Sequence, residues 1–219
     1  MHGLFARQSM KTVAIFGGTF DPIHNGHLQS ALELKQQLQL DEVRLLPCHR
    51  PPHRDTPSCS SSQRLDMVQL AVTDTDLIVD EREMLRPGLS YSIDTLEQYR
   101  HELGNDVSLC WIMGTDAFAQ FDRWHRWQDF LSLAHIIVIS RPGAKLPVVG
   151  PLAELAAQYQ CSDENELQVR PNGSVLFLTL QPYPISATGI RSAIASNQSV
   201  ERFLPTAVLN YIHVHQLYQ

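Results

Sequence analysis

The sequence has no long apolar run. None of its stretches approaches the roughly 20 consecutive apolar residues that a membrane-spanning helix needs. Residues 1–10 also lack the continuous hydrophobic core of a secretory signal, and Met10 directly precedes the first apolar segment. We therefore expect residues 1–10 to be a dispensable leader, residues 11–219 to form the folded domain, and the protein to reside in the cytoplasm.

Cysteine is scarce. The chain has four cysteines, far apart, with no CxxC pair and no zinc-finger spacing to histidine: Cys48, Cys59, Cys110 and Cys161. This pattern argues against a disulfide framework and against a zinc ribbon, and free thiols agree with a reducing compartment. Cys48 lies next to a possible site, and we expect it to play no nucleophilic role.

An excess of positive charge is also missing. Seventeen Lys and Arg residues stand against 23 Asp and Glu residues, which gives a net charge of −6. Without a global basic field, the protein is not expected to bind nucleic acid or an anionic membrane. Two common nucleotide fingerprints are absent too, the GxxxxGKS/T loop and the GxGxxG turn, which disfavours a P-loop hydrolase and an ordinary dehydrogenase.

Short apolar runs and helical patterns alternate along the whole chain. The runs predict six strands, near residues 13–16, 43–46, 77–79, 107–113, 135–139 and 175–180. This alternation predicts a single α/β domain with a doubly wound, Rossmann-like parallel sheet and helices on both faces, in which residues 143–174 form a variable excursion. In such sheets the ligand lies beyond the carboxyl ends of the strands where strand order reverses, commonly the first and the fourth.

The first and fourth predicted strands both end in glycine. Gly17 and Gly18 follow the first strand, and we expect them to make a tight turn that a ligand can approach closely. Asn25 is the expected N-cap of the helix after this turn. Gly114 and Asp116 follow the fourth strand. A nucleotide site is therefore predicted between the two strand ends.

Two helix starts carry groups that suit a polyphosphate. His24 and His27 are three residues apart, so both can point toward the same space at the start of the first helix. Ser186 and Thr188 open a short helix late in the chain, with Arg191 on the same side as Thr188. Free N–H groups and the positive end of the helix dipole favour anions at both places.

Three segments together resemble a known family. GGTFDPIHNGH at 17–27, ISATGIR at 185–191 and RPG at 141–143 are similar to the bacterial nicotinate-mononucleotide adenylyltransferases of the HxGH nucleotidyltransferase superfamily. The resemblance runs from about Lys11 to the end of the sequence. It implies an enzyme of NAD biosynthesis that joins ATP to nicotinate mononucleotide, giving deamido-NAD and pyrophosphate.

The resemblance also implies the ATP site. His24, His27 and Arg191 are the implied catalytic residues, which contact the ATP phosphates, and Asp116 is the implied acceptor for ribose hydroxyls. The full implied set of ATP-binding residues is Gly17, Gly18, Thr19, Phe20, His24, His27, Gly114, Asp116, Ser186, Thr188 and Arg191.

The second substrate has its own implied residues. Ser92, in an SYS segment where the family has SYT, is expected near the nicotinate carboxylate. Trp124 is expected to stack on the pyridine ring, beside His125 where the family often has tyrosine. His53 and Arg54, in the PPHR segment, are expected near the mononucleotide phosphate.

The implied reaction is direct attack of the mononucleotide phosphate on the α-phosphorus of ATP. Such a nucleophile is already ionised, so no general base or covalent intermediate is needed. The sequence shows no carboxylate cluster for a metal, and Mg²⁺ is expected to arrive with ATP. The expected partners are the two small substrates, and a homo-oligomer is left open.

Three other functions are alternatives to the one that the resemblance implies. The acceptor could be another phosphate, such as phosphopantetheine or nicotinamide mononucleotide. A nucleotide-binding regulator without turnover is disfavoured by the intact His24, His27 and Arg191. A nucleic-acid-binding module is disfavoured by the negative net charge.

Overall fold

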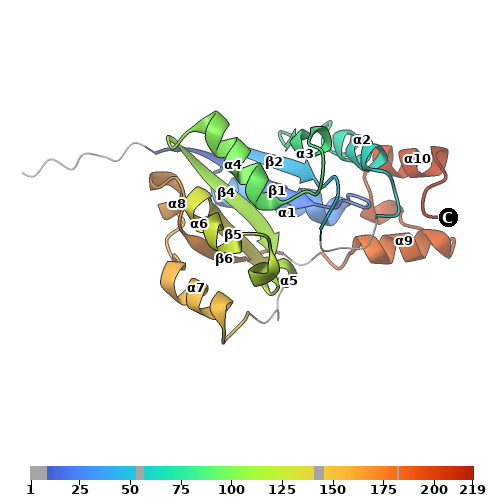
Figure 1. The fold of residues 1–219 in the computed structure, drawn as a ribbon. Coiled ribbons are helices and arrows are strands. Elements are labelled where there is room, and N and C mark those ends of the chain that lie inside the picture. Colours follow the sequence, from blue (N-terminus) through green and yellow to red (C-terminus); the bar gives the residue numbers. More distant parts are fainter. Residues whose placement is uncertain (1–8, 53–56, 141–145, 182) are drawn as a thin grey trace, which may run out of the picture.

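Six parallel strands form one sheet at the centre of the protein (Figure 1). The computed structural model describes residues 9–52, 57–140, 146–181 and 183–219. The strand order is β3-β2-β1-β4-β5-β6, so β1 lies between β2 and β4, where strand order reverses. The strands are β1 Lys11–Gly18, β2 Glu42–Pro47, β3 Ile78–Val79, β4 Val107–Gly114, β5 His135–Ser140 and β6 Val175–Thr179. The predicted doubly wound α/β domain is confirmed.

Helices cover both faces of this sheet. One face carries α1 (Asn25–Gln37), α2 (Ser61–Ala71), α8 (Glu166–Val169), α9 (Ala187–Ala195) and α10 (Thr206–Val214). The other carries α4 (Ser92–Leu103), α5 (Thr115–Phe118), α6 (Phe130–Leu133) and α7 (Pro151–Tyr159). Short turns complete the described chain: α3 (Arg82–Leu85), η1 (Phe121–Arg123), η2 (Trp127–Asp129) and η3 (Glu201–Phe203). Figure 1 shows α2, α9 and α10 grouped on the right.

The alternation of side chains along β1 builds two hydrophobic cores. Ala14 and Phe16 face the α1 side, whereas Val13 and Ile15 face the α4 side, and all four are buried. Successive side chains of a strand point to opposite faces, so a strand covered on both sides is continuously apolar. This explains why the sequence showed unbroken apolar runs.

The N-cap of α1 lies one residue before the predicted one. His24, not Asn25, is this N-cap, because it exchanges capping bonds with His27. Ser60 is the N-cap of α2, and Tyr91 is that of α4, which begins at Ser92. Within the described part of the chain, no helix is long and apolar enough to cross a membrane.

His135, at the start of β5, is a buried and neutral histidine. Its Nδ1 accepts the N–H of Ser174 at 3.0 Å, and its Nε2 lies 2.9 Å from the carbonyl oxygen of Arg170, to which it donates. Burial lowers the pKa of His135 to about 4, from the ordinary 6.5. Both ring nitrogens therefore serve the connection between β5 and the segment before β6.

His135 should make the protein less stable in acid. Between pH 6.5 and 4 the side chain of His135 is protonated in the unfolded chain but not in the folded one. Acidification over this range therefore lowers the free energy of unfolding, by at most about 3 kcal/mol. His135→Asn retains an acceptor but cannot titrate. Urea unfolding from pH 7 to 4.5 should show a steeper loss for the unmodified protein than for the variant. Parallel pH profiles would contradict this assignment.

Candidate functional site

The two glycines that follow Phe16 do not form the predicted turn. Gly17 and Gly18 are the last residues of β1, and the left-handed residue comes later, at Phe20, with φ of 49°. A Cβ on Gly17 would lie 3.0 Å from the Trp111 ring, and one on Gly18 would lie 2.8 Å from the Phe20 ring. The glycines are therefore needed for close packing of two aromatic rings at the end of the strand, and the expectation of a glycine turn was wrong.

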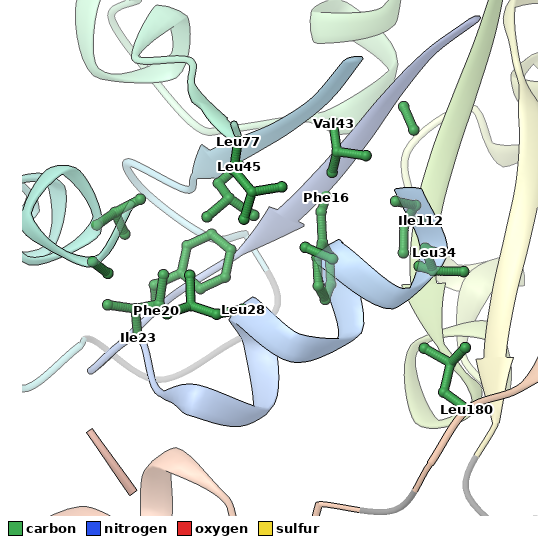
Figure 2. Close-up of a cluster of buried hydrophobic side chains, with 14 of the residues drawn as sticks. Phe16, Phe20, Ile23, Leu28, Leu34, Val43, Leu45, Leu77, Ile112 and Leu180 are labelled. Atoms are coloured by element: carbon green, nitrogen blue, oxygen red, sulfur yellow. The ribbon is translucent and has the colours of Figure 1, made fainter. Parts of the chain in front are cut away.

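Phe20 anchors the turn between β1 and α1. Figure 2 shows it in the α1-side core with Ile23 and Leu28, and only 3% of it is exposed. A left-handed conformation in a residue other than glycine costs about 1–3 kcal/mol. Burial of an aromatic side chain offsets a similar amount, about 1.5–3 kcal/mol. The Phe20 ring also meets the edge of the His27 ring, with centroids 5.1 Å apart.

The two motif histidines are stacked on one another. Their ring centroids are 3.7 Å apart and their planes differ by 19°. The backbone N–H of His24 donates to Nδ1 of His27 at 3.3 Å. Because Nδ1 accepts this bond, the neutral ring of His27 carries its proton on Nε2. The prediction that the two imidazoles share one space is confirmed, and His27 is fixed in the tautomer that donates through Nε2.

The two distant motifs come into direct contact. Arg191 Nη1 donates to the backbone carbonyl oxygen of Asp21 at 2.7 Å. A Cβ on Gly26 would lie 2.8 Å from Cγ2 of Ile185, so a glycine is required where α1 meets the segment before α9. The predicted convergence of the histidine motif with the Ser/Thr/Arg segment is therefore confirmed.

The start of α9 combines capping with exposed donors. Ser186 is the N-cap, and its Oγ accepts the N–H of Gly189 at 3.1 Å. Thr188 is exposed in the first turn, and Arg191 Nη2 lies 3.4 Å from its Oγ1. The Ser186 hydroxyl retains its hydrogen for donation, since it only accepts in the cap. The cap and a phosphate-binding role are thus compatible.

The end of β4 lies beside the end of β1. Phe16 pairs with Ile112, two residues before Gly18 and Gly114 respectively. A Cβ on Gly114 would meet no atom within 4 Å, in contrast to the two glycines of β1. Asp116 follows in α5 and is exposed. The space above Gly114 is open at the point where the fold predicts a ligand.

Three further segments contact one another, namely those after β2, before α4 and around His125. Ser90 Oγ accepts the N–H groups of His49 and Arg50, each at 3.2 Å, which ties the segment after β2 to the segment before α4. The rings of Tyr91 and His125 lie 4.5 Å apart. The segments that contain Ser92 and His125, both expected to bind the second substrate, are thus brought together.

Trp124 lies between the two short turns η1 and η2. It follows η1 in an extended conformation, and Arg126 between the two tryptophans is left-handed, with φ of 51°. The Trp124 ring packs edge-on against Phe121 and Phe130, with centroids 5.5 and 6.0 Å away, and is half-buried. One side of the indole supports the core while part of it faces solvent.

Two of the predicted substrate residues, His53 and Arg54, lie outside the described residues, as does the RPG segment at 141–143. Arg44, on β2, pairs with Glu42 at 2.6 Å and approaches Asp80 at 3.6 Å. Its charge belongs to an ion-pair network between β2 and β3.

Arg64 is a site-supporting residue that sequence reasoning missed. It is fully buried, and it donates from Nη1 to the carbonyl oxygen of Thr19 at 2.6 Å and from Nη2 to that of His49 at 3.1 Å. Burial lowers its pKa, and among the described residues no carboxylate forms an ion pair with it. The buried face of α2 is Arg64, Met67, Val68 and Ala71. The signal was an arginine in register with apolar residues at i+3, i+4 and i+7.

Cys48 follows β2, and its surroundings make its thiol unreactive. Burial raises the pKa of its thiol to about 12. A thiol with this pKa stays protonated at neutral pH and is a poor nucleophile. The environment of Cys48 agrees with the expectation that it plays no nucleophilic role.

Comparisons with known proteins agree with this geometry. A family model described as cytidylyltransferase-like matches residues 15–193. A "Probable nicotinate-nucleotide adenylyltransferase" of Cellvibrio japonicus is 50% identical over 209 residues, covering 95% of this chain and 99% of the relative. A protein of the same name from Pseudomonas paraeruginosa is 47% identical over 210 residues, covering 95% and 98%.

Solved structures share the fold. A Plasmodium falciparum nicotinic acid mononucleotide adenylyltransferase complexed with NaAD matches with a TM-score of 0.72 at 15% identity, covering 95% of this chain and 97% of that one. The same protein complexed with APC matches with a TM-score of 0.69.

Proposed function

The chain belongs to the cytidylyltransferase-like family and, within it, to the nicotinate-nucleotide adenylyltransferases, and on this premise we propose that it joins ATP to nicotinate mononucleotide. The products would be deamido-NAD and pyrophosphate. The family resemblance inferred from the three motifs is confirmed. The substrates, the roles of individual residues and the mechanism are what we propose.

One observation carries the proposal more than any other, namely the contact between the two motifs. Arg191 bonds to Asp21, three residues before His24, so the starts of α1 and α9 meet. Each helix start offers free N–H groups and a positive dipole end. A triphosphate has the charge and the length to bridge two such starts. This arrangement supports ATP as the anion bound there.

We assign the phosphates to specific donors. His27 would donate from Nε2, the nitrogen that its tautomer leaves protonated, and His24 would act beside it. Ser186, Thr188 and Arg191 would hold the β and γ phosphates. These donors neutralise charge that builds up on the leaving pyrophosphate, which is the largest contribution an enzyme makes to such a transfer.

The adenosine half would lie over the end of β4. The open space at Gly114 leaves room for the ribose, and the exposed Asp116 would accept its hydroxyl hydrogens. Thr19 and Phe20, at the end of β1, would line the side facing the phosphates. This placement follows the general rule for doubly wound sheets.

Nicotinate mononucleotide would bind on the side of α4. Ser92 is the first residue of a 12-residue helix, so its hydroxyl and the free N–H groups around it suit the nicotinate carboxylate. Trp124 would stack on the pyridine ring beside His125. His53 and Arg54 are kept as the proposed contacts to the phosphate.

Mg²⁺ would enter as part of the substrate Mg-ATP. Among the described residues, no three His, Cys, Asp or Glu side chains gather into a group that could hold a metal. Magnesium commonly relies on substrate phosphates and water for most of its ligands. The chain's own contribution is to align two anions for in-line attack, for which correct orientation supplies a large share of the rate.

Pyrophosphate release tests this function directly. Purified protein and Mg-ATP would be combined with nicotinate mononucleotide, nicotinamide mononucleotide, phosphopantetheine or no acceptor. We expect the fastest release with nicotinate mononucleotide, with deamido-NAD as the second product. Faster release with one of the other acceptors, or none with any, would refute the proposed substrate.

A further inference from the structure

Asp21 is a buried carboxylate at the centre of several segments. Only 6% of it is exposed, and it lies between Phe20 and the cis peptide bond to Pro22. Its Oδ2 accepts the N–H of Ser58 at 2.7 Å, and its Oδ1 accepts the hydroxyl of Tyr218 at 2.8 Å. A buried carboxylate is costly unless it is well supplied with hydrogen bonds. These two donors therefore hold Asp21 in place.

The backbone of the same residue holds Arg191. The carbonyl oxygen of Asp21 accepts Nη1 of Arg191 at 2.7 Å. The position of the Asp21 side chain and the position of its carbonyl are coupled, because a single residue carries both. Tyr218 is thus connected to Arg191 through one intervening residue.

Tyr218 is well suited to this connection. It adopts a left-handed conformation with φ of 65°, and the preceding Leu217 is buried and bonded to the carbonyl of Ile212 at the end of α10. Burial, together with the neighbouring Cys59 and Asp21, raises the pKa of Tyr218 well above its usual value, so the phenol stays a donor. Figure 1 shows this end of the chain between α9 and α10.

We propose that Tyr218 is a positioning residue for nucleotide binding, and that it acts through Asp21 to set the guanidinium of Arg191. The inference rests on the proposed function only in taking the anion at α9 to be the phosphates of ATP. Once Nη1 is bonded to Asp21, the ligand would be bound by Nε and by Nη2, which lies 3.4 Å from Thr188 Oγ1. A shift of Asp21 would turn this fork away from the phosphates. Guanidinium–phosphate bonds depend strongly on such geometry.

The chain contains a matched control for Tyr218. Tyr211, on α10, donates its hydroxyl to Asp66 on α2 at 2.7 Å, a bond of the same kind and length. Among the described residues, no hydrogen bond, ion pair or ring contact joins Tyr211 or Asp66 to a candidate site residue. Tyr218→Phe and Tyr211→Phe each remove one phenol–carboxylate bond, so they should lower the urea midpoint of unfolding by similar amounts.

The test is Mg-ATP binding by calorimetry, with steady-state kinetics beside it. We expect Tyr218→Phe to raise the dissociation constant of Mg-ATP by about tenfold, the size of one weakened charged hydrogen bond. The Michaelis constant for the mononucleotide should stay near that of the unmodified protein. Tyr211→Phe should change neither quantity. Equal ATP affinity in Tyr218→Phe and the unmodified protein would overturn the inference, as would equal weakening by both variants.

A double substitution shows whether Tyr218 acts through Arg191. In an Arg191→Lys background, Tyr218→Phe should weaken ATP binding by less than about twofold, because coupled residues are not additive. A full tenfold effect in that background would refute the connection. If the unmodified protein binds Mg-ATP but uses another acceptor, the proposed function fails while this inference stands. If the unmodified protein transfers to nicotinate mononucleotide and Tyr218→Phe leaves the affinity for Mg-ATP unchanged, the proposed function stands and this inference fails.

Discussion

Replacing His27 with alanine should lower kcat by about 10²–10³, the usual loss when one preorganised donor to transition-state charge is removed. The contacts that fix the His27 ring include stacking on His24, edge contacts with Phe16 and Phe20, and the bond from the His24 N–H to Nδ1. A ring held in this way loses little entropy when it donates. Steady-state pyrophosphate release with both substrates at saturating concentrations measures the change in kcat.

Two further substitutions separate the roles of the ring nitrogens. His27→Asn keeps an acceptor for the N–H of His24 but has no donor at the position of Nε2. His27→Gln carries its amide N–H₂ near that position. We therefore expect Asn to be as slow as Ala, and Gln to recover part of the lost rate. An Asn variant with normal turnover would show that Nε2 of His27 does not contact the reacting phosphates.

The second large effect is expected at Arg64, which does not itself contact substrate. Its Nη1 and Nη2 hold the carbonyls of Thr19, directly after β1, and of His49, shortly after β2. Lysine keeps the charge but replaces the planar fork by a single nitrogen. Misplacing a site by about 1 Å costs about 10²-fold in rate. We expect Arg64→Lys to lower kcat/KM for both substrates by about this factor.

Arg100 provides the control for Arg64. It too donates to backbone carbonyls, among them those of Leu133 at 2.6 Å and Val107 at 2.8 Å, at the opposite end of the sheet. Burial lowers the pKa of Arg100 as it does that of Arg64. Arg100→Lys should lower the free energy of unfolding, by about 1.5–3 kcal/mol for each charged hydrogen bond lost, and leave kcat/KM unchanged. If both variants lost activity in proportion to stability, Arg64 would be structural only.

The fold was predictable because its signals are local. Runs such as Val13 to Phe16 are apolar throughout since both faces of the sheet are covered, and this pattern needs no knowledge of distant residues. The reversal of strand order between β1 and β4 followed from the rule for doubly wound sheets. Helix starts were less certain, as at His24, where a histidine caps the helix in place of the asparagine beside it.

The site was predictable where a motif carried it, and not where it depended on contacts across the fold. The histidine motif and the segment around Arg191 were paired by resemblance, and their contact is confirmed. Arg64 was missed because its partners, the carbonyls of Thr19 and His49, lie far from it in the sequence. The bond from Tyr218 to Asp21 joins residues far apart in the sequence, and no local sequence pattern predicts it.

Several expectations remain predictions. They concern the roles of His53 and Arg54, the dispensability of residues 1–10, the cytoplasmic location and the homo-oligomer. Residues 1–8 lie outside the described residues, whereas the N–H of Met10 donates to the carbonyl of Gln168 at 2.8 Å. A truncation that starts at Met10 would therefore keep this bond.

The paired glycines at the end of β1 connect the proposed nucleotide site to both hydrophobic layers. Gly17 lies against Trp111 of the α4-side core, and Gly18 lies against Phe20 of the α1-side core. Because a glycine has no side chain that could move aside, a displaced Trp111 or Phe20 ring would shift the backbone at the end of β1. Substitutions deep in either layer, far from any substrate, could therefore tune nucleotide affinity, and a search for altered specificity should include them.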